Sequence, residues 1–209
     1  MDKFKIYEQM LIETNKKFNL TSIDDPKEIR IKHFEDSLTI KSYINKGMKV
    51  LDIGSGAGFP GIPLRIEKDF DLTLIDSVNK KVNFMNEVIE ELKLEKAKAV
   101  HVRAEDYAKD HREEFDMVIS RAVANLSTLS EYALPFLKVG GIFIAMKGPK
   151  VEEEYEQAQN ALKILGGELI NIDTIDLYGN TRKNILIKKV RSTKKKYPRG
   201  KNQPKKNPL

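Results

Sequence analysis

The chain has 209 residues, a formal net charge of +6 and no cysteine. This length suits one catalytic domain with its own core, and the lack of cysteine excludes disulfides, thiolate metal ligands and cysteine nucleophiles. The three histidines are scattered along the chain, so no metal site is expected. No apolar run approaches the ~20 residues of a membrane span, and the first residues are too charged for a signal peptide. We therefore expect a soluble, cytoplasmic protein that contacts no membrane.

The predicted elements begin with two helices. Apolar residues recur at helical spacing over residues 1–18 and again over about 26–44, and "NLTSIDDP" separates the two runs. We assign residues 1–45 to a short N-terminal helical extension.

A regular alternation of strands and helices follows this extension. Buried-strand patterns are separated by helical patterns, of which residues 78–92 give the clearest. The predicted strands are 50–53, 72–75, 99–102, 117–120 and 142–146. Such alternation predicts right-handed crossovers and a parallel sheet.

The rhythm changes near the end of the chain. A helix over about 152–165 should stop at Gly166 and Gly167. Two strand-like runs, 168–177 and 184–190, then follow with only "YGNTRKN" between them, so they should form an antiparallel hairpin. The expected fold is an α/β, Rossmann-like class I domain over residues 46–190. Its seven-stranded, mainly parallel sheet ends in this hairpin, as in methyltransferases that use S-adenosylmethionine (SAM).

Basic residues gather after the hairpin. Positions 188–209 hold ten Lys and Arg and no acid, so this segment carries +10 and the preceding residues carry −4. Such a segment is either a solvated, disordered end or a contact for a polyanion, most often nucleic acid. We expect residues 191–209 to form a flexible basic tail.

A glycine-rich loop follows the first strand, in "KVLDIGSGAGFPGIPL" at residues 49–64. Gly56–Gly61 fits the G-x-G-x-x-G dinucleotide pattern, whereas the register from Asp52 gives D-x-G-x-G-x-G, the usual opening of a SAM site. In either register, glycines let a ligand approach the main chain closely, and the helix that follows favours polar or anionic groups.

Three acids at strand ends favour SAM. Asp52 would repel a pyrophosphate but attract a cationic sulfonium, Asp76 can accept both ribose hydroxyls, and Glu105 suits an adenine amino group. Simpler alternatives exist for each: Asp52 can cap the loop, Asp76 can cap the next helix, and Glu105 can be an exposed acid.

Six ordered segments together resemble one family. They are "NLTS" (19–22), "HFEDSL" (33–38), "LDIGSGAGFPGIPL" (51–64), "LIDSVNKKVNF" (74–84), "RAED" (103–106) and "ISRAVANL" (119–126). The sequence closely resembles the small-subunit (16S) ribosomal RNA guanine-N7 methyltransferase family, RsmG, over nearly its whole length. One departure is that "NLTS" arrives after only 18 residues, whereas family members often have a longer lead-in.

The resemblance implies a set of cofactor-binding residues, to which Asp76 is added on the ribose argument. The set comprises Gly54, Gly56, Phe59, Asp76, Ala104, Glu105 and Arg121. Phe59 can instead be a core aromatic under the loop, and Arg121 can instead form a structural ion pair. In its functional role, Arg121 would hold the methionine carboxylate, the guanine or a phosphate.

The implied chemistry needs no catalytic residue. Guanine N7 already has a free lone pair, so alignment and electrostatics can supply most of the acceleration and no general base is required. The basic tail and Lys80-Lys81 would attract the RNA backbone, Lys147 is a weaker RNA-contact candidate, and the target guanine would be accessible or flipped. We expect small-subunit rRNA or the assembled subunit as partner, and a monomer.

Three alternatives stay open from the residues alone. One is a SAM-dependent methyltransferase with another RNA, a protein or a small molecule as acceptor. Another is a nicotinamide-dependent oxidoreductase that uses the Gly56–Gly61 register. The third is a non-catalytic RNA-binding module, for which the basic tail would suffice.

Overall fold

The computed structural model describes residues 2–121 and 124–209 and contains a seven-stranded sheet in the order β3-β2-β1-β4-β5-β7-β6. The strands are β1 (Lys49–Ile53), β2 (Asp71–Asp76), β3 (Ala97–His101), β4 (Phe115–Arg121), β5 (Leu137–Lys147), β6 (Gly167–Leu177) and β7 (Asn180–Lys189). The first five pair in parallel, and β7 runs antiparallel to both β5 and β6. The predicted parallel sheet and closing hairpin are confirmed. The turn between β6 and β7 is shorter than expected, because Thr181–Lys183 already pair with β6.

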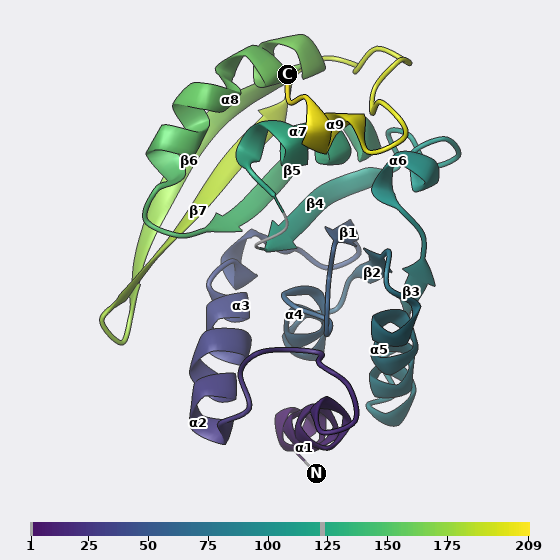
Figure 1. The fold of residues 1–209 in the computed structure, drawn as a ribbon, viewed down its shortest axis with the longest axis vertical. Coiled ribbons are helices and arrows are strands. Elements are labelled where there is room, and N and C mark those ends of the chain that lie inside the picture. The colour runs from purple at the N-terminus through teal and green to yellow at the C-terminus, as the bar shows by residue number, and fades with distance from the viewer. Residues whose placement is uncertain (1, 122–123) are drawn as a thin grey trace.

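Helices cover both faces of this sheet (Figure 1). They are α1 (Lys3–Asn15), α2 (Pro26–Ile29), α3 (Asp36–Leu38), α4 (Gly61–Glu67), α5 (Asn79–Glu91), α6 (Ala104–Tyr107), α7 (Leu126–Ala133), α8 (Val151–Leu165) and α9 (Gln203–Lys206). Alternate strand residues face opposite sides, so Val50 of β1 packs with α1, α4 and α5, whereas Leu51 packs with α7 and α8.

The prediction of one continuous second helix is wrong. Instead of one helix over about 26–44, α2 leads into a π-helical segment, Arg30–Glu35, then α3 and a short 3₁₀ turn, Lys41–Tyr43. A π-helix is rare and often marks a functional site, and hydrophobic periodicity over so few residues does not distinguish it from an α-helix. Here it contains His33, which reaches the site described below.

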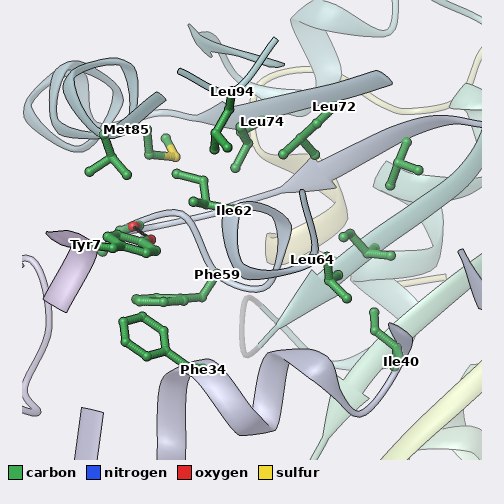
Figure 2. Packing of buried hydrophobic residues seen from close by; sticks show 14 of the residues in the cluster. Tyr7, Phe34, Ile40, Phe59, Ile62, Leu64, Leu72, Leu74, Met85 and Leu94 are labelled. Atoms are coloured by element: carbon green, nitrogen blue, oxygen red, sulfur yellow. Dashed lines mark hydrogen bonds between the residues drawn. The ribbon is translucent and has the colours of Figure 1, made fainter. Parts of the chain in front are cut away.

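The N-terminal extension shares the core of the sheet. Tyr7 is fully buried and stacks on Phe59 of the glycine loop, with ring centroids 5.4 Å apart, and Phe34 packs against both rings (Figure 2). The Tyr7 hydroxyl also donates a hydrogen bond to the carbonyl of Ala57 at 2.5 Å. Helix α1 therefore packs against the glycine loop and supports it through Tyr7.

The basic C-terminal segment differs from the expected flexible tail. It turns back over α7 (yellow in Figure 1), with Tyr197 and Pro204 buried. Arg112 donates hydrogen bonds to the carbonyls of Thr193 and Tyr197, which fixes the start of the segment. The charge pattern did not reveal this docking, because the partners of these groups lie far away in sequence.

Candidate functional site

A cavity of about 460 Å³ lies at the carboxyl ends of β1, β2, β3 and β4. Five of the seven predicted cofactor residues line it: Gly54, Asp76, Ala104, Glu105 and Arg121. The carboxyl edge of a parallel sheet, where the strand order reverses, is the usual ligand site in α/β folds. The volume falls within the range of small-molecule sites.

The glycine loop is tied to the second strand. Gly54 and Gly56 have positive φ angles of 67° and 61°, a conformation that favours glycine. The Gly54 N–H donates to the Ile75 carbonyl at 2.8 Å, and the Gly56 N–H donates to an Asp76 carboxylate oxygen at 3.0 Å. Gly56 thus belongs to the site through Asp76, although it is not one of the cavity-lining residues.

The position of Asp76 is compatible with both alternatives that the sequence left open, the helix cap and the ribose acceptor. Its other carboxylate oxygen accepts the Val78 N–H at 2.8 Å, at the start of α5, and its side chain also borders the cavity. A carboxylate offers about four acceptor sites, so these two backbone bonds leave capacity for ribose hydroxyls. The residue is oriented by the backbone on both sides, as a preorganised acceptor should be.

Phe59 lies under the loop and is not among the cavity-lining residues. Its ring is 4% exposed and stacks on His33 with centroids 4.4 Å apart. The Arg121 guanidinium lies over the same ring, 5.1 Å from its centroid. The ring therefore has the position of the core aromatic that we considered, and it supports Arg121 from below.

Asp52 also faces the protein interior. It is fully buried, one carboxylate oxygen accepts the Gly61 N–H at the start of α4 at 2.8 Å, and the other has no partner among the described residues. Burial raises the pKa of Asp52 to about 7, while the Gly61 bond and the charge of Arg121 act in the opposite direction. The loop-capping alternative describes this geometry better than attraction of a sulfonium.

Arg121 is held by the N-terminal extension. One guanidinium nitrogen donates to an Asp36 carboxylate oxygen at 2.9 Å and to the Lys32 carbonyl at 3.0 Å, and the other lies 3.1 Å from His33 Nδ1. Arg182 of β7 donates to the second Asp36 oxygen at 3.1 Å. Arg121 therefore forms the ion pair named as its alternative, and it borders the cavity as well.

The tautomer of His33 follows from its neighbours. Arginine has only donors, so Nδ1 must accept from Arg121, and Nε2–H then donates to the Thr21 hydroxyl at 2.8 Å. Burial, reinforced by the positive charge of Arg121, lowers the pKa of His33 to about 3. Thr21 and His33 belong to "NLTS" and "HFEDSL", but no spacing in the sequence connects either segment to Arg121.

A second cavity of about 770 Å³ shares Arg121 and Ala124 with the first. Lys32, Lys147 and Arg182 also line it. Lys147 is only 7% exposed and donates to Glu154 at 2.8 Å and to the Ala124 carbonyl. Lys147 therefore fixes the loop after β4, whereas Lys32 pairs with Glu28 and Arg182 pairs with Asp36.

Neither a membrane helix nor a metal cluster occurs among the described residues. No helix within 2–121 or 124–209 has the length and apolar character needed to cross a membrane. Across the same ranges, no three His, Asp or Glu side chains are grouped so that they could hold a metal ion.

The sheet order, the glycine loop and the acids at consecutive strand ends define a class I SAM-dependent methyltransferase. Solved structures agree on the fold: a SAM-dependent methyltransferase from Aquifex aeolicus has a TM-score of 0.60 at 20% identity, covering 86% of this chain and 98% of that one. TYW2 from M. jannaschii, solved with AdoMet, has a TM-score of 0.61 at 18% identity, covering 76% of each chain.

The family follows from sequence. Residues 1–184 match the GidB family, described as rRNA small subunit methyltransferase G. The chain is 49% identical to the Ribosomal RNA small subunit methyltransferase G of Desulforamulus reducens, over 99% of this chain and 89% of the relative. A Clostridium botulinum protein of the same name is also 49% identical, over 100% and 90%. The chain therefore belongs to this family of SAM-dependent rRNA methyltransferases, and the predicted family, fold class, enzyme class and cofactor are confirmed.

Proposed function

We propose that this protein transfers the methyl group of SAM to N7 of a guanine in small-subunit ribosomal RNA, with SAM in the 460 Å³ cavity. The observation that carries the proposal is that Gly54, Asp76, Glu105 and Arg121 come from four strand ends and border one cavity. A cytoplasmic, monomeric enzyme that acts on RNA or on the assembled subunit is part of the same proposal.

The residues fit the parts of SAM. Asp76, 8% exposed and oriented by two backbone N–H groups, would accept the ribose hydroxyls. Glu105, 7% exposed and beside Ala104, would accept the adenine amino group. Arg121, with its guanidinium fixed by Asp36 and His33, would pair with the methionine carboxylate.

The second cavity suits the acceptor. It meets the first at Arg121 and Ala124, and Lys32 and Arg182, which line it, would attract the RNA backbone. SAM supplies an electrophilic methyl group on a sulfonium. The residues of the protein align the two partners and exclude water, and N7 needs no proton removed. A flipped guanine would reach the junction of the two cavities.

Two conservative substitutions test the cofactor site. Asp76→Asn and Glu105→Gln should each weaken SAM binding about tenfold or more, which equals roughly 1.4 kcal/mol. Asp106→Asn is the matched control, because Asp106 is exposed and pairs with Lys109 outside the cavity. Calorimetric titration with SAM measures the effect. A separate titration with NAD tests the rival class of cofactor. Unchanged SAM affinity in both variants would place the cofactor elsewhere.

A separate assay tests the acceptor. Incubation with labelled SAM and either small-subunit RNA or assembled subunits, followed by nucleoside analysis, should yield N7-methylguanosine. SAM binding without N7-methylguanosine in every such substrate would assign the enzyme another acceptor. NAD binding without SAM binding would overturn the proposed cofactor.

A further inference from the structure

The basic C-terminal segment borders the cofactor cavity. Asn202 and Lys205 line the cavity together with Asp76 and Glu105. Both lie beyond residues 1–184, the part of the chain that the family model matches. Figure 1 shows the segment and its short helix α9 running beside α7 and close to α6. The first two residues of α6 are Ala104 and Glu105.

A buried ion pair fixes this segment to α7. The Glu131 side chain is 1% exposed, and its two carboxylate oxygens accept from Arg199 Nε at 2.9 Å and from the terminal guanidinium nitrogen at 2.7 Å. The backbone N–H of Arg199 adds a third bond to the same carboxylate at 2.8 Å. A bidentate pair on so deeply buried a carboxylate has one arrangement rather than many.

The same face of α7 links the segment to the cavity. Thr128 lines the cavity, and its hydroxyl donates to the Pro204 carbonyl at 2.9 Å. Tyr132 also lines it, and its hydroxyl lies 3.5 Å from Asn202. Next to Thr128, the Ser127 hydroxyl donates to the Leu209 carbonyl at 2.8 Å. Residues 199–206 therefore dock on α7, and two residues of this helix, Thr128 and Tyr132, also line the cavity.

We propose that residues 199–206 complete the SAM site as one of its walls, with Asn202 and Lys205 contacting the bound cofactor and Arg199–Glu131 holding the wall in place. This inference rests on the proposed position of SAM in the 460 Å³ cavity. Removing the wall would open the adenine and ribose side of the cavity to water, and the hydrogen bonds of Asp76 and Glu105 to the cofactor would weaken accordingly.

Binding of SAM in the absence of RNA tests this proposal. Arg199→Ala should raise the Kd for SAM at least tenfold, and Lys205→Ala and Asn202→Ala should each raise it two- to fivefold. Lys206→Ala is the matched control, because Lys206 is exposed on the same short helix and does not line the cavity. A second control, Lys194→Ala with Lys195→Ala and Lys196→Ala, removes three exposed charges before the wall and should leave the Kd unchanged.

Hydrogen exchange on the unmodified protein covers the case in which Arg199→Ala fails to fold. SAM should slow exchange in residues 199–206 together with the glycine loop and residues 103–105. Protection of the loop and of 103–105 without protection of 199–206 would overturn the wall and leave the proposed cofactor site standing. Protection of none of these segments would overturn the cofactor position as well.

Discussion

The Nδ1 atom of His33 accepts a hydrogen bond from Arg121, 88 residues further along the chain. The imidazole is hydrogen-bonded at its two nitrogens to this guanidinium and to the Thr21 hydroxyl, and one face of it stacks on the ring of Phe59. Through this contact the π-helical segment fixes the arginine that stands between the two cavities. His33 is thus a positioning residue, and it acts through Arg121.

Replacing His33 should therefore impair methyl transfer more than folding. His33→Leu removes the acceptor that orients the Arg121 guanidinium, whereas His33→Asn offers a carbonyl oxygen near the position of Nδ1. We expect His33→Leu to lower kcat/KM about tenfold or more and His33→Asn to recover part of the loss. Steady-state kinetics with thermal unfolding as a control measure this. Equal activity of both variants and the wild type would contradict the positioning role.

The free energy of unfolding should depend on pH in a way that reflects protonation of His33. The folded-state pKa of about 3 lies below the ordinary 6.5, so the unfolded chain takes up a proton first as the pH falls. The folded protein then loses up to about 1.4 kcal/mol per pH unit between pH 6.5 and 3 from this group. His33→Asn cannot titrate and should show a shallower acid slope in urea unfolding. Identical slopes would mean that His33 is accessible to protons in the folded state.

Asp52 should produce a slope of the opposite sign. Its folded-state pKa of about 7 lies above the ordinary 3.8, so its contribution to stability is complete below pH 4 and is lost as the pH rises to 7. Asp52→Asn keeps an acceptor for the Gly61 N–H and does not ionise. Relative to wild type, the variant should therefore gain up to about 1.4 kcal/mol per pH unit over that interval. Urea unfolding at pH 4, 6 and 8 measures this difference.

The same variant separates two interpretations of Asp52. If the carboxylate only caps α4, Asp52→Asn should bind SAM within about twofold of wild type. A loss of tenfold or more would restore the sulfonium argument made from the sequence. Asp76 borders the cavity, so Asp76→Asn serves as the positive control for loss of binding.

Local sequence pattern predicted most of the sheet and the place of the candidate site. Strands β1, β2 and β4 and helix α5 follow from apolar periodicity, which is a property of neighbouring residues. The site residues at strand ends follow because parallel strands bring their carboxyl ends together. The contacts of His33 with Arg121 and of Arg199 with Glu131 depend on tertiary packing between distant segments. A charge such as that of Glu131 looks solvent-exposed in sequence until its partner is known.

Asp52 illustrates a different limit. The sequence favoured SAM partly because an acid preceded the glycines, and that choice of cofactor is right. The carboxylate nevertheless turns to the Gly61 N–H, 2.8 Å away, and away from the cavity. A strand alternates its side chains between two faces, so the position of an acid near a loop does not by itself reveal which groups it touches.

Tyr7→Phe should loosen the glycine loop. The substitution removes the donor to the Ala57 carbonyl and keeps the stacking on Phe59. A buried carbonyl without its donor costs about 1–3 kcal/mol, so unfolding should shift to lower urea and SAM should bind more weakly. Tyr178→Phe is the control, because Tyr178 is 68% exposed and should change stability by less than about 0.5 kcal/mol. Unchanged stability of Tyr7→Phe would mean that the carbonyl finds another donor.

Gly58 and Gly56 should respond differently to alanine. Both have positive φ angles, 103° and 61°, which alone cost alanine about 1–2 kcal/mol. A Cβ at Gly56 would meet nothing within 4 Å, whereas at Gly58 it would lie 2.5 Å from Ile62 Cδ1 and 2.6 Å from the Tyr7 hydroxyl. Gly58→Ala should therefore be the more destabilising by about 1–3 kcal/mol, with an unchanged m value in urea unfolding.

The double variant Tyr7→Phe, Gly58→Ala identifies the source of that difference. Removing the hydroxyl takes away one of the two atoms that the new Cβ would strike, and the crowded loop can relax toward α1. The double variant should therefore lose less stability than the two single variants together, by about 0.5 kcal/mol or more. Gly56→Ala combined with Tyr7→Phe should be additive, because its Cβ lies in open space. If the stability losses are additive in both double variants, α1 does not fix the position of the glycine loop through Tyr7.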